Sequence, residues 1–253
     1  MSRNMTELLL VVDFDGTVYR GDEPARRYAR RIAATLPPGA AERYLDAFER
    51  YVAEGVAAAL TSTDAVEAAA LRDAVDPWGV AMHLAARCHD VPAAVLEDAF
   101  AGARRDMLDP SCELEVVAPL VRELTRLRGA VRVLLATNSP RAGLAPLLDR
   151  LGVAGAFDAV LPGADKPAGL RLLLRRELGP DLRTRPWRLF SLGDHYPNEI
   201  APAVEIGAAA GYIDRFGRAD GPATASAPVV EQLLPAIHAW VADPQAAAVC
   251  AAR

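Results

Sequence analysis

The sequence predicts an α/β fold, a doubly wound parallel sheet with an inserted all-α region. Three observations predict it. A short hydrophobic run at residues 8–12 ends in two aspartates, a long Ala- and Arg-rich stretch with helical signals follows, and the second half alternates short hydrophobic runs with helical segments. Repeated βα units join parallel strands through right-handed crossovers. We therefore predict a sheet domain from residues 1–18 and 115–253 and a helical domain from residues 19–114.

The first strand is predicted over residues 8–12, Leu-Leu-Leu-Val-Val. Five apolar residues are too few for a helix and are typical of a strand buried on both faces. Asp13 and Asp15 follow it two residues apart, so on a continuing strand both would point to one face before Gly16 ends it. Two carboxylates so close repel each other unless a cation or a shared proton relieves them. Taken alone, this stretch is also compatible with an ordinary Asp-rich turn.

The region from residue 19 to residue 114 reads as helical throughout. Start and stop signals divide it: Pro37-Pro38-Gly39 breaks one segment, Ser62-Thr63-Asp64 is suited to cap the next, and a proline near the first turn opens the last two. No strand signal of comparable strength interrupts these segments. His83, Cys88 and His89 lie within two helical turns here, but without a matching fourth ligand we interpret them as packing and surface residues.

The second half alternates strands and helices. The predicted strands cover residues 131–136, 159–161, 188–192 and 208–213, and the predicted helices cover 117–127, 141–151, 166–178, 198–206 and 229–241. Residues 214–228, rich in Gly, Pro, Ala and Ser, are predicted to form a loop.

Polar residues follow the first strand and several of the later ones: Asp13 and Asp15, Thr137 and Asn138, Lys166, and Asp194. In an open parallel sheet these strand ends meet at one edge, where ligands bind. Lys166 is the sole lysine among 28 basic residues, and a lysine differs from arginine as a compact, flexible point charge. Carboxylates, a hydroxyl and an ammonium at one edge suit a divalent cation together with a phosphoryl group.

Composition bounds the class of protein. The chain has 253 residues, 52% hydrophobic composition and a net charge of −5, so it has no excess of basic residues for nucleic acid or an anionic membrane. A small phosphorylated molecule is the expected partner. Three widely spaced cysteines indicate no disulfide framework, and neither a signal peptide nor an apolar run of about eighteen residues is present, so we expect a cytoplasmic protein. The oligomeric state cannot be read from the sequence.

The run Asp-Phe-Asp-Gly-Thr at residues 13–17 resembles the first motif of the haloacid dehalogenase (HAD) superfamily of phosphatases and phosphotransferases. Thr137-Asn138, Lys166 and Gly193-Asp194 resemble its second, third and fourth motifs, in the family's order. The resemblance implies a HAD-like Rossmannoid catalytic core, in residues 1–18 and 115–253. It also implies that the helical region, residues 19–114, is a cap of the C1 type, because it is inserted directly after the first motif.

The resemblance also implies roles. Asp13 would be the nucleophile that forms an aspartyl-phosphate, Asp15 the general acid and base, and Lys166 the cation that neutralises the phosphoryl oxygens. The implied phosphate-binding residues are Gly16, Thr137, Asn138 and Lys166, and the implied Mg²⁺ ligands are Asp13, Asp15 through its backbone carbonyl, and Asp194. Glu199 follows the fourth motif in place of the commoner aspartate, and the resemblance implies that it contacts a metal-bound water.

The implied function is a Mg²⁺-dependent phosphomonoester hydrolase for a small phosphorylated metabolite. Dehalogenases of the superfamily lack the second acid of the first motif, so Asp15 argues for phosphoryl chemistry. P-type ATPases continue the first motif with Lys-Thr-Gly-Thr and carry membrane helices. Two alternatives stay open: a phosphomutase or phosphotransferase of the same fold, which excludes water from the intermediate, and a non-catalytic phosphate-binding signalling module.

Overall fold

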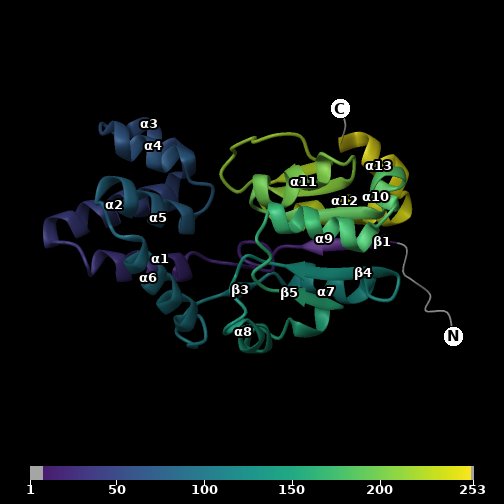
Figure 1. The fold of residues 1–253 in the computed structure, drawn as a ribbon, viewed down its shortest axis with the longest axis horizontal. Helices are drawn as coiled ribbons and strands as arrows, with labels where there is room; N and C mark the ends of the chain where they lie inside the picture. Colours follow the sequence, from purple (N-terminus) through teal and green to yellow (C-terminus); the bar gives the residue numbers. More distant parts are fainter. Residues whose placement is uncertain (1–7, 252–253) are drawn as a thin grey trace. The chain divides into compact units, whose positions relative to one another are not determined.

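The structure is a computed structural model that describes residues 8–251, with side chains to Ala248. The chain divides into two compact units. The sheet unit contains the described residues up to Arg20 and from Glu115 onward, and the helical unit is Gly21–Leu114. Helices and strands of each unit are labelled in Figure 1. The interpretation of these units as a catalytic core and a cap stays a prediction.

The sheet unit is built on six parallel strands, which confirms the predicted doubly wound α/β fold. Their order is β5-β4-β1-β6-β7-β8. The strands are β1 Leu8–Val12, β4 Val131–Ala136, β5 Ala159–Leu161, β6 Leu189–Gly193, β7 Ala209–Ile213 and β8 Ala225–Ala227. Strand β1 lies in the middle, with Leu10 paired to Val133 of β4 on one side and to Phe190 of β6 on the other. This central position explains the unbroken apolar run of β1, because both of its faces are buried.

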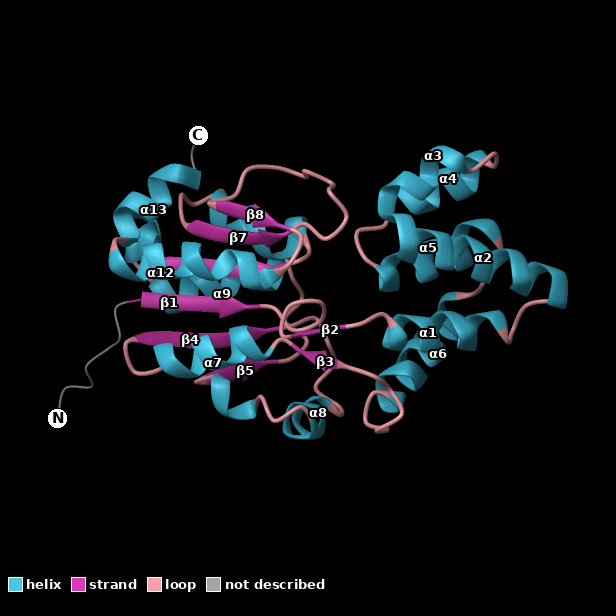
Figure 2. Ribbon diagram, turned by 180° about the vertical axis from the view of Figure 1, so that it is seen from behind, coloured by secondary structure: helices cyan, strands magenta, loops and turns pink. Residues whose placement is uncertain are grey.

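Helices flank this sheet (Figure 2). They are α7 Ala118–Leu127, α8 Leu144–Arg150, α9 Ala168–Leu178, α10 Asp181–Thr184, α11 Ala201–Val204, α12 Leu234–Ala242 and α13 Pro244–Ala251. Single 3₁₀ turns form at Ala154–Ala156, Pro186–Arg188 and Val230–Leu233, and a π-helical turn forms at Tyr196–Ile200. One face of β1, through Leu9 and Val11, packs in a buried cluster with Leu170 and Leu174 of α9. The apolar spacing of α9 is what attaches it to the sheet.

Strand β8 corrects the prediction of a loop over residues 214–228. Its three residues, Ala225-Ser226-Ala227, include neither a β-branched nor an aromatic side chain, so no local signal marks them as a strand. They become one because β7 offers its backbone edge, with Gly211 opposite Ala225. The two-residue strands β2 Tyr19–Arg20 and β3 Glu115–Val116 likewise form by pairing with a partner strand. They pair with each other, antiparallel, where the chain leaves and re-enters the sheet unit.

The helical unit contains α1 Glu23–Ala33, α2 Pro38–Glu54, the 3₁₀ turn Gly55–Ala57, α3 Ala58–Thr61, α4 Ala65–Asp73, α5 Pro77–Cys88 and α6 Ala93–Asp106. The predicted cap at Asp64 is confirmed, because its side chain accepts hydrogen bonds from the backbone N–H groups of Val66 and Glu67. Helix α2 ends at Gly55, whose φ of +61° favours glycine. No strand occurs among the residues of this unit, all of which are described.

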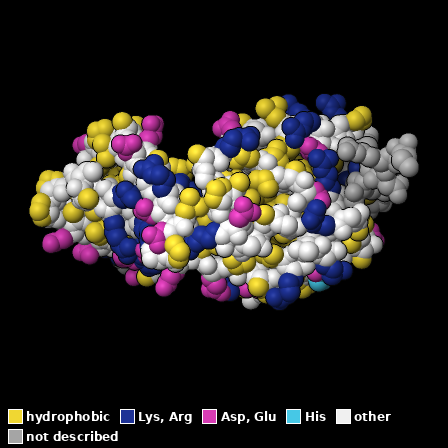
Figure 3. Space-filling view, turned by 90° about the horizontal axis from the view of Figure 1, so that it is seen from below, with side chains coloured by type: hydrophobic (Ala, Val, Ile, Leu, Met, Phe, Trp, Pro, Cys, Tyr) yellow, Lys and Arg dark blue, Asp and Glu magenta, His cyan; other side chains and the backbone are white. Residues whose placement is uncertain are grey.

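Basic and acidic side chains are interspersed on the face of the molecule seen in Figure 3. In the part of the chain that is described, no helix is both long enough and apolar enough to cross a bilayer. Cys88 and Cys112 are free thiols, and Cys250 lies outside the residues whose side chains are described.

Candidate active site

Asp13 directly follows β1 and continues its pairing, since its backbone N–H donates to the carbonyl of Leu192 on β6 at 2.9 Å. The side chain is buried, with 6% of the residue exposed. Its Oδ2 lies 3.5 Å from the hydroxyl of Thr17, which donates to it from the same turn. The carboxylate is therefore held at the carboxyl edge of the central strand, as its position in the sequence predicts.

Lys166 joins this carboxylate from a distant part of the chain. Its Nζ lies 2.5 Å from Asp13 Oδ1 and 2.6 Å from Glu199 Oε1. The loop that carries Lys166 is fixed by Asn138, whose Oδ1 accepts from the Lys166 backbone N–H at 2.7 Å and whose Nδ2 donates to the Lys166 carbonyl at 3.3 Å. The predicted meeting of Asp13 and Lys166 at one edge is thus present in the structure. The phosphate-binding role of Asn138 stays a prediction, and in this structure its amide holds Lys166 in place.

Burial and the charges of neighbouring groups together shift the pKa values of Asp13, Glu199 and Lys166. Burial raises the pKa of Asp13, an effect that the nearby Lys166 ammonium opposes and the Asp15 carboxylate reinforces. Burial likewise raises the pKa of Glu199, to about 8, although Lys166 again opposes it. Burial disfavours the ammonium of Lys166, but the two carboxylates outweigh that effect and raise its pKa. One ammonium thus faces two acidic side chains whose ionisation is opposed by burial.

Asp15 lies apart from Lys166 in its contacts. The hydroxyl of Tyr19 donates to its Oδ1 at 2.5 Å, and the hydroxyl of Ser139 donates to its Oδ2, also at 2.5 Å. Neither Tyr19 nor Ser139 was predicted as a site residue. The signals were nevertheless in the sequence, because Ser139 directly follows Thr137-Asn138 at the end of β4 and Tyr19 stands four residues after Asp15.

Gly16 brings the first and fourth motifs together. Its φ of +80° lies in the region that favours glycine. A methyl group placed on it would overlap the carboxylate of Asp194, which follows β6. Gly16 is therefore required twice, by its own backbone and by the acid that packs against it. The approach also means that Asp194 reaches the turn that contains Asp13, as predicted.

Thr137 is buried at the end of β4, with 1% of the residue exposed. Its Oγ1 accepts a hydrogen bond from the backbone N–H of Ser139 at 3.0 Å, and its own N–H donates to the carbonyl of Leu161 on β5. The hydroxyl thereby shapes the turn that presents Ser139 to Asp15. Its predicted contact with a phosphate stays a prediction.

Glu199 connects Lys166 with the turn after Asp194. Its Oε2 accepts from the backbone N–H of His195 at 2.8 Å while its Oε1 contacts the lysine. Gly193 permits this approach, because a methyl group there would meet Glu199 Cγ at 2.5 Å. The carboxylate thus orients Lys166, and its predicted contact with a metal-bound water stays a prediction.

The donor atoms of this site can be compared with the ligands that a divalent cation prefers. Within residues 8–251, no group of three or more His, Cys, Asp or Glu side chains is arranged to hold a metal ion. The predicted ligands are fewer, namely the carboxylates of Asp13 and Asp194 and the backbone carbonyl of Asp15. Mg²⁺ prefers such oxygen donors and keeps several waters, so a small protein ligand set suits it.

The fold and site define a class: a doubly wound α/β protein with paired acids and a buried lysine at the carboxyl edge of its sheet. Comparison with models of known families shows the family within this class. The model of the haloacid dehalogenase-like hydrolases matches residues 8–179, and the chain belongs to this family. The match spans β1 and the Lys166 loop. Among curated proteins, no match was found.

Solved structures share the fold at low sequence identity. YfnB from Bacillus subtilis, a HAD-type protein in a structure bound to magnesium, is 15% identical with a TM-score of 0.56, over 90% of this chain and 97% of that one. A HAD phosphatase from Thermococcus onnurineus is 18% identical with a TM-score of 0.51, over 91% and 97%. A 2-haloacid dehalogenase from Pseudomonas syringae is 17% identical with a TM-score of 0.50, over 92% and 99%. At these identities the likeness shows the fold alone. The structures that share the fold include a phosphatase and a dehalogenase.

Proposed function

We propose that this HAD-family hydrolase is a Mg²⁺-dependent phosphomonoesterase that acts on a small phosphorylated metabolite through an aspartyl-phosphate. The observation that carries the proposal is the contrast between two acids two residues apart. Asp13 is buried beside the Lys166 ammonium, whereas Asp15 is held by the hydroxyls of Tyr19 and Ser139. Two carboxylates in different environments suit two different roles, a nucleophile and an acid and base.

The chemistry assigned to these residues proceeds in two displacements. A carboxylate oxygen of Asp13 forms a bond to phosphorus while the bond from phosphorus to the ester oxygen breaks, and Asp15 gives a proton to that leaving oxygen. Water then attacks phosphorus and gives a proton to Asp15, and the bond to Asp13 breaks to release phosphate. Lys166 holds the Asp13 carboxylate in place and offers positive charge to the phosphoryl oxygens.

Magnesium is part of this proposal. Asp13, the backbone carbonyl of Asp15 and Asp194 would hold Mg²⁺, which would supply positive charge to the phosphoryl oxygens. Support comes from the oxygen-only donor set and the magnesium-bound state of one fold relative.

Asp15 also favours phosphoryl transfer over dehalogenation. The fold relatives include a phosphatase and a dehalogenase, so the fold does not separate the two reactions. A dehalogenase attacks carbon with its first aspartate and has no use for a second acid at this place in the motif. Dehalogenation is therefore the competing reaction that the experiment must exclude.

The helical unit contributes to the proposal through its place in the chain. It begins after Arg20 and ends at Leu114, so it is inserted directly behind the turn that carries Asp13 and Asp15. We propose that it is the cap that selects the substrate. A cap that closes over the site limits the substrate to a small molecule.

The test measures phosphate released from p-nitrophenyl phosphate and from a panel of phosphorylated metabolites, with Mg²⁺ and with a chelator. We expect Mg²⁺-dependent release that Asp13→Asn abolishes. The matched control is Asp149→Asn, an exposed aspartate on α8, which should leave the rate unchanged. Chloride released from 2-chloropropionate without metal, together with no phosphate release from any ester, would refute the proposal.

A further inference from the structure

The loop after β4 and the loop after β5 are fastened to each other by their backbones. The N–H of Gly163, in the second loop, donates to the carbonyl of Ser139, in the first, at 2.8 Å. The N–H of Ala164 donates to the carbonyl of Thr137 at 2.9 Å. These bonds continue the contact between β4 and β5 past the carboxyl ends of both strands. The two loops therefore form one body.

Asn138 adds a side-chain clasp to this body. Its Oδ1 accepts from the backbone N–H of Lys166, and its Nδ2 donates to the carbonyl of the same residue. A side-chain amide can make both bonds because it carries an acceptor and a donor in one plane. One amide thus satisfies both backbone groups of Lys166, and it fixes the point from which the lysine side chain departs.

The joined loops present one side chain to each acid of the first motif. The Nζ of Lys166 lies 2.5 Å from Asp13 Oδ1. The hydroxyl of Ser139 donates to Asp15 Oδ2, also at 2.5 Å. Lys166 and Ser139 are 7% and 4% exposed, so their directions follow from the position of the loops that carry them. Because the loops form one body, the contacts to the two acids are set together.

A comparable clasp joins β4 and β5 at the other end of β5. Asp158, directly before β5, accepts through its side chain from the backbone N–H of Val133 on β4 at 2.8 Å. The contact is of the same kind, a side-chain oxygen on a backbone N–H between the same two strands. It lies away from the loops that carry Lys166 and Ser139, so it offers a matched control for the effect of a clasp on stability alone.

We propose that Asn138 is a positioning residue for phosphoryl transfer. It locks the loops after β4 and β5 together, so that Lys166 on Asp13 and Ser139 on Asp15 keep a fixed relation. The proposal rests on the function proposed above for the two acids. A clasp that aligns reacting groups acts on turnover as well as on stability, because small displacements of such groups cost large factors in rate.

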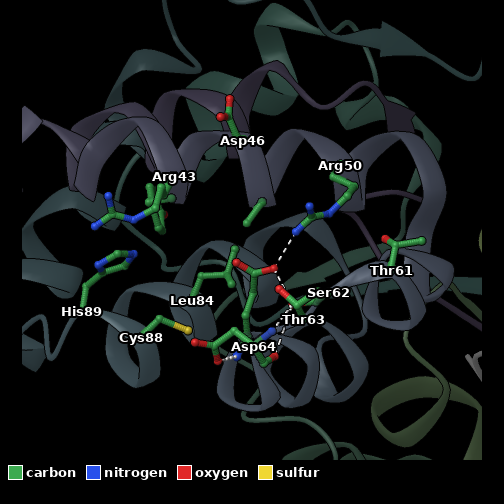
Figure 4. A pocket seen from close by; sticks show the side chains of 13 residues that line it. Arg43, Asp46, Arg50, Thr61, Ser62, Thr63, Asp64, Leu84, Cys88 and His89 are labelled. Atoms are coloured by element: carbon green, nitrogen blue, oxygen red, sulfur yellow. Dashed lines mark hydrogen bonds and ion pairs between the residues drawn. The ribbon is translucent and has the colours of Figure 1, made fainter. Parts of the chain in front are cut away.

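Hydrogen exchange of backbone amides, followed by NMR, tests the clasp without any need for turnover. The Lys166 N–H should exchange slowly in the parent, and Asn138→Ala should speed its exchange at least about tenfold. Asn138→Asp retains the acceptor and should retain the protection. Ser62→Ala should leave this exchange unchanged, because it removes a hydroxyl that donates to Glu67 at 2.7 Å on the wall of a pocket in the helical unit (Figure 4).

Steady-state kinetics on p-nitrophenyl phosphate with Mg²⁺ test the positioning. Asn138→Ala should lower kcat at least about tenfold, with a smaller change in KM. Asp158→Ala should lower Tm and leave kcat within about twofold of the parent. Ser139→Ala should lower kcat about tenfold in the parent but less than about threefold in Asn138→Ala, because loss of the clasp has already released that contact.

Four results would overturn the proposal. They are a Lys166 N–H that is unprotected in the parent or equally slow in Asn138→Ala, equal losses of kcat in Asn138→Ala and Asp158→Ala, full additivity of Asn138→Ala with Ser139→Ala, and a rise in KM without loss of kcat, which would place the Asn138 amide on the substrate. An absence of phosphate release from every ester by the parent would refute the proposed reaction, and with it this role. It is told apart from a failure of the clasp because the exchange measurement needs no turnover.

Discussion

In the sheet unit the ammonium of Lys166 lies between the carboxylates of Asp13 and Glu199, with all three residues at most 7% exposed. In the helical unit the arginines that pair with acids lie nearer the solvent, as in the pair of Arg26 on α1 with Glu49 on α2, whose side chains are 31% and 49% exposed. Removing charges from water is costly, whereas a pair left at the surface gains and loses little. The comparison teaches that the buried cluster is costly to form, whereas the exposed pairs are close to neutral for stability.

The largest effect is expected from removing the buried cation. Lys166→Met leaves the acidic side chains of Asp13 and Glu199 buried without their cationic partner, so the free energy of unfolding should fall at pH 7, by at most about 3–5 kcal/mol. Turnover should be lost as well. Urea unfolding measures the first and phosphate release the second. A variant as stable as the parent would contradict the view that the ammonium holds the two acids.

The pH dependence of stability sharpens the same point. Because the pKa of Glu199 is raised to about 8 by burial, the folded state holds a proton that the unfolded chain loses above about 4.5. The free energy of unfolding of the metal-free protein should therefore decrease as pH rises from about 5 to 8, by about 2–4 kcal/mol, and level off above that window. Urea unfolding with a chelator at several pH values measures it. Glu199→Gln should flatten the curve, and an unchanged slope in that variant would locate the proton elsewhere.

A matched pair of glycines tests the close approach of Asp194. Gly16 and Gly152 both have positive φ, +80° and +67°, but a side chain would collide with a carboxylate only at Gly16. Gly152→Ala should cost about 1–2 kcal/mol for the backbone alone. Gly16→Ala should cost more than that and abolish turnover, since Asp194 must move. If Gly16→Ala and Gly152→Ala destabilised the protein equally and Gly16→Ala kept normal activity, the close approach of Asp194 to Gly16 would not be required.

A smaller effect is expected from the hydroxyl groups that hold Asp15. Tyr19→Phe should lower kcat about tenfold with little change in KM, because the carboxylate loses one of the donors that orient it. Tyr212→Phe is the matched control, since its hydroxyl donates to Asp220 at 2.8 Å in the same unit. Steady-state kinetics on p-nitrophenyl phosphate compare the two. A similar loss of kcat in both variants would indicate a general effect on stability.

The smallest effect belongs to the exposed pair. Arg26→Gln breaks the contact with Glu49, yet the free energy of unfolding should change by less than about 1 kcal/mol, because both side chains are partly solvated. Urea unfolding at low and moderate salt measures it. A loss as large as that of Lys166→Met would remove the distinction between the two units.

Much of the fold and part of the site follow from local pattern. The apolar run of β1 and the repeated βα units predicted a parallel sheet, and that prediction is confirmed. Because parallel strands place their carboxyl ends at one edge, the same pattern predicted that Asp13 and Lys166 would meet, although 153 positions separate them. Hydrophobic periodicity suffices for these predictions because it is written along the chain itself.

Other features depend on partners that no local pattern names. Strand β8 exists because β7 offers an edge, and the Ser139 hydroxyl finds Asp15 only after β4 and β1 have paired. Glu199 was predicted to lie beside a metal-bound water, and the structure places its carboxylate on Lys166.

The sequence by itself therefore determined five of the six strands of the main sheet, the edge at which the polar residues gather and the family to which the motifs point. Only the tertiary structure decided which long side chains pair, and it alone revealed that Asn138 joins the loops after β4 and β5. The physical reason is that strand and helix formation depend on periods of a few residues. Pairing of charged side chains and the joining of two loops depend on packing between elements that are distant in the chain.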